Sequence, residues 1–136
     1  MMQLQQEMYD QIVVQGLAEF PNECCGFVAG QGAGWNGQPV KVFRMKNADS
    51  SPSTYRMEPR EQLQVQNEMD DNGWDIYAIY HSHTHSQAFP SETDRNQAFY
   101  PDSFYALLSL EDRENPVFRA FRIVEGEITE EQVKIV

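Results

Sequence analysis

Cysteine is scarce in this chain, which contains only Cys24 and Cys25, side by side. Vicinal cysteines rarely pair with each other, so the sequence excludes a disulfide framework, and it has no C-x-x-C motif for a cysteine zinc or redox site. We expect both thiols to be packing residues in a buried strand rather than nucleophiles. The cysteine content is typical of a reducing compartment, and we expect a cytoplasmic protein.

Basic residues and long apolar runs are also few. Lys and Arg number 10 against 21 Asp and Glu, and the net charge of -11 argues against a nucleic-acid partner or an anionic membrane surface. No apolar run approaches the ~20 residues that a membrane-spanning helix needs. The first ten residues lack the basic-then-apolar pattern of a signal peptide. A homo-oligomer remains compatible with this composition.

The length of 136 residues suits a single domain over residues 1–136. Periodicity predicts helices at 4–20, 59–71 and 91–99, and strands at 24–29, 40–45, 75–80, 103–110, 117–124 and 132–135. Loops are expected at 31–39 and 47–53. The irregular alternation of these elements indicates an α+β (mixed α/β) fold, with a central mixed β-sheet flanked by helices.

His81 and His83 stand one residue apart at the end of a predicted strand. Side chains alternate along a strand, so both imidazoles lie on one face. Asp94 follows eleven residues later, in the first turn of a predicted helix, and the loop at 84–90 is long enough to fold it back over the histidines. Two His, one carboxylate and a water form the ligand set of an open catalytic zinc site, since nitrogen ligands favour zinc over magnesium or calcium.

Simpler interpretations of the same residues stay open. Ser91 and Asp94 fit a capping box that merely starts a helix, and an isolated H-x-H is usually a polar strand end. A purely structural zinc site would need a fourth protein ligand, which only His85 offers here. We expect His85 to be a solvated loop residue, with a spare ligand or a substrate contact as the alternatives. The joint occurrence of all these residues favours the catalytic site.

The string His81-Ser82-His83, seven further residues, Ser91, two more and Asp94 resembles the signature of JAMM/MPN+ zinc metalloproteases. Glu23 lies 58 residues before His81, where that family has a glutamate. The resemblance implies an MPN-like fold in which His81, His83 and Asp94 bind Zn²⁺. It also implies that Glu23 is the general base and acid and that Ser91 helps to hold the oxyanion. Without this resemblance, nothing in the sequence distinguishes Glu23 from the other acidic residues.

Thr84 indicates which subgroup of the family the chain resembles. Many members of the family have proline at that position, whereas the bacterial Mec-like subgroup has threonine. Residues 47–52 and Tyr55-Arg56-Met57 also resemble that subgroup. The implied partner is a ubiquitin-like sulfur-carrier protein with a Gly-Gly C-terminus. The implied reaction, in cysteine biosynthesis, hydrolyses the bond between that C-terminal glycine and an attached cysteine. The loops at 31–39 and 47–53 are candidates to flank the groove for the carrier tail.

Two further functions remain as alternatives. The first is a broader isopeptidase that removes ubiquitin-like modifiers from lysines, for which the chemistry is the same and only the leaving amine differs. Only 42 residues follow Asp94, which leaves little room for the extra segments of the eukaryotic deubiquitinating relatives. A non-catalytic MPN scaffold is disfavoured, because such relatives typically lack the metal ligands that this sequence has.

Overall fold

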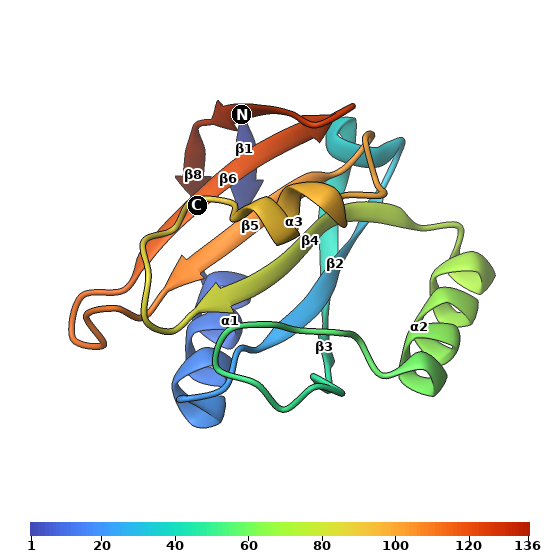
Figure 1. The fold of residues 1–136 in the computed structure, drawn as a ribbon. Helices are drawn as coiled ribbons and strands as arrows, with labels where there is room; N and C mark the ends of the chain where they lie inside the picture. Colours follow the sequence, from blue (N-terminus) through green and yellow to red (C-terminus); the bar gives the residue numbers. More distant parts are fainter.

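A computed structural model describes all residues from 1 to 136, and its largest element is a six-stranded mixed sheet (Figure 1). The helices are α1 (Gln6–Glu19), α2 (Pro59–Asn72), α3 (Glu92–Asn96) and the short 3-10 helix η1 (Gly34–Asn36). The strands are β1 (Met2–Leu4), β2 (Cys25–Gln31), β3 (Gln38–Met45), β4 (Asp75–His83), β5 (Phe104–Ser109), β6 (Val117–Val124), β7 (Glu127–Glu131) and β8 (Val133–Ile135). The predicted α+β class and mixed sheet are therefore confirmed.

The strands of the large sheet follow the order β3-β2-β4-β5-β6-β7, and the two ends of the chain meet in a small parallel pair of β1 and β8. Within the large sheet only β4 and β5 run parallel; the other neighbours are antiparallel. A parallel pair needs a crossover connection. Here the crossover contains α3, which lies against the C-terminal end of β4. This connection decides where the functional site forms.

Each face of the sheet has its own core. On one face α1 and β1 pack through Met8, Ile12 and Leu4 against the sheet. On the other face Met69 of α2 and Met57 of the segment before it pack against the sheet residues Phe27 and Ile79. No helix in the structure is both long and apolar enough to span a bilayer. The second core borders the end of β4 and supports the site described below.

Local sequence signals explain why α2 has these limits. Pro59 occupies its first turn, where a missing N–H costs nothing, and the Glu58 side chain accepts a hydrogen bond from the Glu61 N–H at 2.8 Å. Gly73 ends the helix with a φ of 68°, a left-handed conformation that glycine adopts without strain. The prediction for this helix is therefore confirmed to within one residue.

Several predicted boundaries are wrong. Leu4 was expected in the first helix but lies in β1, because its side chain is buried beside the parallel partner β8. The strand expected to end at Tyr80 continues through His83, since its pairing with β5 continues that far. The loop expected at 31–39 contains η1 and the start of β3. The last predicted strand, at 132–135, is confirmed as β8, but β7 before it is missing from the prediction, and the third helix is shorter than expected.

Candidate metal centre

Strand β4 positions the two histidines. Both are buried, and because they are two residues apart their rings lie on the same face of the sheet. Ser82 between them points the other way, where its hydroxyl oxygen accepts a hydrogen bond from the Cys24 N–H at 2.8 Å. Ser82 N–H in turn donates to the Cys24 carbonyl at 3.0 Å. The middle residue of the motif therefore fastens β4 to the strand that follows Glu23.

Asp94 reaches the histidines from α3. Its Oδ2 lies 2.9 Å from His83 Nε2 and its Oδ1 lies 3.2 Å from His81 Nε2, while the two Nε2 atoms are 3.2 Å apart. One ligand atom from each of the three residues falls within 4.8 Å of the others. The structure therefore brings together the three residues that the sequence predicts as metal ligands.

Several hydrogen bonds hold the loop between β4 and α3 and the end of β4 in place, and this loop positions Asp94 beside the two histidines. His83 Nδ1 lies 2.9 Å from the Gln87 carbonyl, and Ser109 Oγ donates to the Ser86 carbonyl at 2.6 Å. The Leu110 N–H donates to the His83 carbonyl at 2.8 Å. The contact to Gln87 also fixes the orientation of the His83 ring, as outer hydrogen bonds of metal-binding histidines commonly do.

Burial and mutual contact set the charges of the cluster. Burial lowers the pKa of His81, which favours the neutral imidazole that metals bind, although the Asp94 hydrogen bond opposes this shift. Burial also lowers the pKa of His83, but the Asp94 and Gln87 hydrogen bonds outweigh it and the net shift is upward. For Asp94, burial disfavours the charge, yet the hydrogen bonds from both histidines hold the pKa well below its usual range. Asp94 is thus a carboxylate, ready to bind a cation.

Glu23 lies just before β2. The strand register aligns it with the group formed by His81, His83 and Asp94, here called the metal cluster. Cys25 pairs with His81, and the Cys24–Ser82 hydrogen bonds continue that antiparallel register, which places Glu23 opposite His83 on the same face. Glu23 is buried, and burial raises the pKa of its carboxyl to about 7, with His83 opposing and Asp94 reinforcing the shift. A group titrating there is suited to exchange protons at neutral pH.

Ser91 is the N-cap of α3 and lies exposed beside Asp94. Its Oγ accepts a hydrogen bond from the Asp94 N–H at 3.1 Å, and its own N–H donates to Asp94 Oδ2 at 2.9 Å. The capping box anticipated as the simpler interpretation is therefore present. A hydroxyl that accepts a cap hydrogen bond still has its own hydrogen to donate, so capping leaves the donor role open.

The remaining candidates lie outside the cluster. His85 is exposed, and its Nδ1 lies 2.8 Å from the Thr84 hydroxyl. Cys24 and Cys25 are both free and buried. Burial raises the pKa of Cys24 to about 11 and raises that of Cys25 as well, so neither is a thiolate at neutral pH. The expectation that they are packing residues agrees with this environment.

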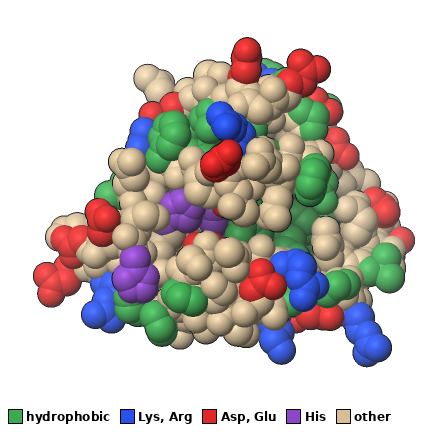
Figure 2. All heavy atoms as spheres, viewed as in Figure 1, with side chains coloured by type: hydrophobic (Ala, Val, Ile, Leu, Met, Phe, Trp, Pro, Cys, Tyr) green, Lys and Arg blue, Asp and Glu red, His purple; other side chains and the backbone are tan.

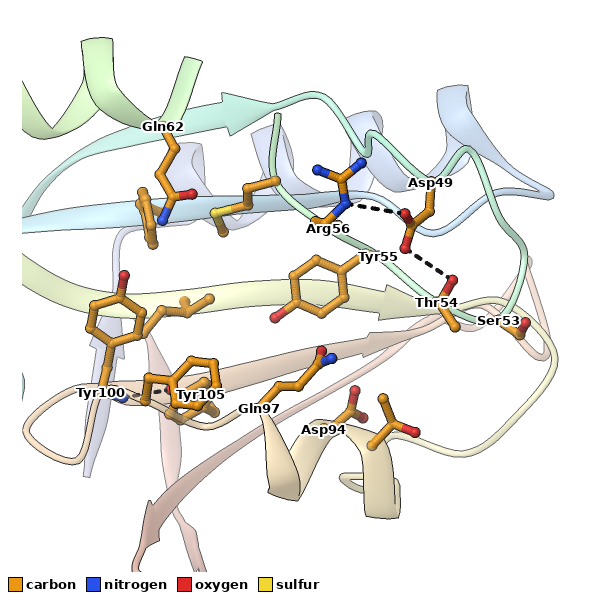
Figure 3. Close-up of a pocket in the computed structure, with 15 residues that line it drawn as sticks. Asp49, Ser53, Thr54, Tyr55, Arg56, Gln62, Asp94, Gln97, Tyr100 and Tyr105 are labelled. Carbon is orange, nitrogen blue, oxygen red and sulfur yellow. Dashed lines mark hydrogen bonds and ion pairs between the residues drawn. The ribbon is translucent and has the colours of Figure 1, made fainter. Parts of the chain in front are cut away.

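A cavity of about 410 Å³ adjoins the metal cluster (Figure 3). Asp94 and Gln97 line it on one side and Tyr55 on the other, as the close-up shows. Its apolar lining includes Phe27, Met57, Ile79, Phe99, Tyr100 and Tyr105. Figure 2 shows histidine side chains on the floor of a hollow, with apolar side chains beside them. Sequence reasoning missed this cavity, because its lining comes from residues that are widely separated in the chain, from Phe27 to Tyr105.

Of the two loops predicted to flank the substrate groove, one lines the cavity and the other does not. Asp49 and Ser53, from the predicted loop at 47–53, line the cavity beside the metal cluster. The predicted loop at 31–39 contributes nothing to it; Trp35 and its neighbours line a separate hollow with Trp74 and Asp102. That part of the hypothesis was wrong, because η1 packs against the start of β4 rather than its end.

Comparison with known proteins agrees with this geometry. The chain belongs to the family described as prokaryotic homologs of the JAB domain, whose sequence profile matches residues 5–124. It is 38% identical over 130 residues to the CysO-cysteine peptidase of Mycobacterium tuberculosis, covering 96% of this chain and 88% of that protein. It is 30% identical over 95 residues to the desampylase of Haloferax volcanii, covering 68% of this chain and 66% of that protein.

Solved structures show the same fold. A protein from Desulfitobacterium hafniense superposes with a TM-score of 0.87 at 31% identity, covering 100% of this chain and 93% of the other. A JAB1/MPN domain protein from Archaeoglobus fulgidus gives a TM-score of 0.62 at 14% identity, with 98% of each chain covered, which shows the fold alone. The resemblance to JAMM/MPN+ proteins is thus confirmed, and the chain is a hydrolase of this family.

Proposed function

We propose that this protein is a zinc metallopeptidase that releases cysteine from the C-terminal glycine of a ubiquitin-like sulfur-carrier protein. The observation that carries the proposal is the 38% identity, over 96% of the chain, to a CysO-cysteine peptidase. The metal cluster and the adjoining cavity supply the chemistry and the space that such a reaction needs. The bond attacked is the amide between the carrier glycine and the cysteine nitrogen.

The donor set suits zinc. His81 and His83 offer two imidazole nitrogens and Asp94 one carboxylate oxygen, and three protein ligands leave a fourth position for water or substrate. No Lys or Arg lies in an ion pair with Asp94, so the carboxylate charge is available for a cation. When bound, zinc supplies Lewis-acid chemistry, polarising the scissile carbonyl and acidifying the attacking water.

Glu23 is the proposed proton carrier. Its carboxylate would take a proton from the attacking water and then deliver it to the cysteine nitrogen as the amide breaks. The raised pKa of about 7 in the metal-free protein reflects burial, and a cation bound next to it would lower the pKa again and favour the ionised base. The buried position of Glu23 also limits the water around the reacting carbonyl.

Ser91 is the proposed oxyanion donor. Its hydroxyl oxygen accepts the Asp94 N–H, which fixes the oxygen beside the metal ligand and leaves the hydroxyl hydrogen free to turn toward the carbonyl oxygen. A preorganised donor of this kind stabilises the transition state by about 3 kcal/mol.

The cavity is the proposed channel for the carrier tail. Asp94 lies on its wall, so a chain that fills the cavity ends at the metal cluster. An extended Gly-Gly tail has no side chains at its end and so needs little width, while apolar side chains further back would contact the apolar lining, which includes Phe27 and Ile79. The predominantly apolar lining favours such burial.

A broader isopeptidase activity is the second candidate, because the chain also resembles a desampylase. The test is to incubate the zinc-loaded protein with two substrates, a carrier–cysteine adduct and a carrier–lysine isopeptide, and to follow both by mass spectrometry. Loss of one cysteine from the adduct, much faster than isopeptide cleavage, supports the proposal. Equal rates, or faster isopeptide cleavage, would replace it with the second candidate.

A further inference from the structure

The two ligand histidines differ in what holds their outer nitrogen. His83 Nδ1 lies 2.9 Å from the Gln87 carbonyl, whereas His81 Nδ1 is buried and has no hydrogen-bond partner. Metal-binding histidines almost always hydrogen-bond through the second ring nitrogen, which fixes the ring orientation. His81 therefore needs another contact to hold its ring toward Asp94.

Tyr55 supplies a contact of the right kind. Its ring stacks on the His81 ring with centroids 4.5 Å apart and an interplanar angle of 26°. No other aromatic ring stacks on His81 in this parallel manner; the His83 ring meets it edge-on, at 62°. A parallel stack restricts rotation of the imidazole about its bond to the chain, which is what the missing hydrogen bond would otherwise do.

Hydrogen bonds hold the backbone on both sides of Tyr55, so the position of its ring over His81 is well defined. The buried side chain of Asn47 donates to the Thr54 carbonyl at 3.0 Å and accepts the Arg56 N–H at 3.1 Å, on either side of Tyr55. The same Asn47 amide donates to the Glu23 carbonyl at 3.1 Å. One buried side chain thus aligns Tyr55 with the residue proposed as the base.

We propose that Tyr55 is a positioning residue of the metal centre, whose ring holds His81 in the orientation that binds zinc. The hydroxyl is not needed for this role, since it makes no hydrogen bond within the protein and faces the cavity in Figure 3. Phenylalanine therefore preserves the function and an aliphatic side chain of similar size does not. The inference concerns zinc binding and stands apart from the choice of substrate in the proposed function.

The experiment measures zinc affinity by competition with a chromogenic chelator for the wild type, Tyr55→Phe and Tyr55→Leu. Tyr100→Leu is the matched control, because Tyr100 lines the same cavity and packs on Phe27 without touching a ligand histidine. We expect Tyr55→Leu to bind zinc at least ~10-fold more weakly, in the range typical of lost outer contacts, and Tyr55→Phe and Tyr100→Leu to bind as the wild type does.

The absorption spectrum of the cobalt-loaded proteins provides a second readout. Tyr55→Leu should shift the cobalt bands, which report ligand geometry, and Tyr55→Phe should leave them unchanged. Thermal unfolding of the metal-free variants separates these effects from a loss of folding, and Tyr55→Met replaces Tyr55→Leu if the latter fails to fold. Wild-type zinc affinity in the aliphatic variant, or an equal loss in Tyr55→Phe, would overturn the proposal.

Discussion

The Asp94 carboxylate lies 2.9 Å from the His83 imidazole, although one side chain comes from a helix and the other from a strand. The capping box that starts α3 orients this carboxylate, because Asp94 Oδ2 accepts the Ser91 N–H and is also the atom nearest His83 Nε2. Helix capping and ligand placement are therefore achieved by the same atoms. A metal site built in this way would be arranged before an ion binds, which would favour affinity.

Replacing Glu23 by glutamine should abolish turnover and stabilise the metal-free protein at alkaline pH. The folded protein raises the pKa of Glu23 from 4.5 to about 7, so wild-type stability is lost as pH rises through that interval. Glutamine has no charge to bury, and near pH 8 Glu23→Gln should gain on the order of 2 kcal/mol in free energy of unfolding. Denaturant unfolding of chelator-treated protein measures this.

The same experiment near pH 5 is the control for Glu23→Gln. The difference between variant and wild type should shrink there to below about 1 kcal/mol, since the folded wild type holds the proton. Asp94 titrates far below this window and does not interfere. A variant that is no more stable than the wild type at either pH would show that Glu23 is not a destabilised, buried carboxylate.

Replacing Ser91 by glycine should separate its two roles. Glycine is tolerated as an N-cap at a cost of only a few tenths of a kcal/mol, so α3 and zinc binding should survive. The hydroxyl donor is lost, and kcat should fall by about 100-fold or more. Steady-state kinetics together with zinc content per chain measure both effects. A near-normal kcat in Ser91→Gly would show that Ser91 only caps α3 and does not act as the oxyanion donor.

Gly26 on β2 is predicted to tolerate no side chain. A Cβ there would collide with the Tyr80 hydroxyl and with the backbone carbonyl of Phe43 on the neighbouring strand. The Tyr80 hydroxyl also hydrogen-bonds the buried Gln15 amide oxygen at 2.5 Å, so it has little freedom to move. Gly26→Ala should cost about 3 kcal/mol of stability and weaken zinc binding through β4.

Gly30→Ala is the matched control on the same strand, since its nearest contact would be 3.1 Å, to the Tyr77 side chain. We expect a clearly smaller drop in the unfolding midpoint for Gly30→Ala than for Gly26→Ala. Equal midpoints for the two variants would show that β2 shifts easily around Gly26.

Filling the cavity should block the carrier tail without disturbing the metal. Gln97 lines the cavity from the end of α3, is exposed, and makes no side-chain hydrogen bond. Gln97→Trp should raise KM for a carrier–cysteine adduct at least about tenfold while zinc content stays at the wild-type level. The control Asn96→Trp alters an exposed neighbour that does not line the cavity. If both variants behave alike, the tail takes another path.

The sequence predicted the clustering of His81, His83 and Asp94 well because their geometry is local. His81 and His83 share a face by strand alternation alone, and Asp94 is tied to Ser91 by a short capping motif. Helix α2 was equally predictable, because Pro59 and Gly73 mark its ends within a few residues of sequence. Such signals need no knowledge of the rest of the chain.

The remaining features depend on contacts between distant segments. The Tyr55–His81 stack and the cavity arise only after residues 53–57 are laid over the end of β4, and no spacing in the sequence records this. The sequence predicts a helix at Leu4, because the strand partner that Leu4 has in the fold, β8, lies at the opposite end of the chain. The alignment of Glu23 with His83 likewise follows from strand register, which only the folded sheet defines.

The central claim is that His81, His83 and Asp94 hold a catalytic zinc ion, and titrating zinc into metal-free protein tests it most directly. Cysteine release from a carrier–cysteine adduct should rise in proportion to added zinc and level off at one ion per chain. Asp94→Asn should show neither the rise nor tight zinc binding, because the carboxylate ligand is lost. Full turnover by the metal-free protein, or an unaltered titration curve for Asp94→Asn, would contradict the account.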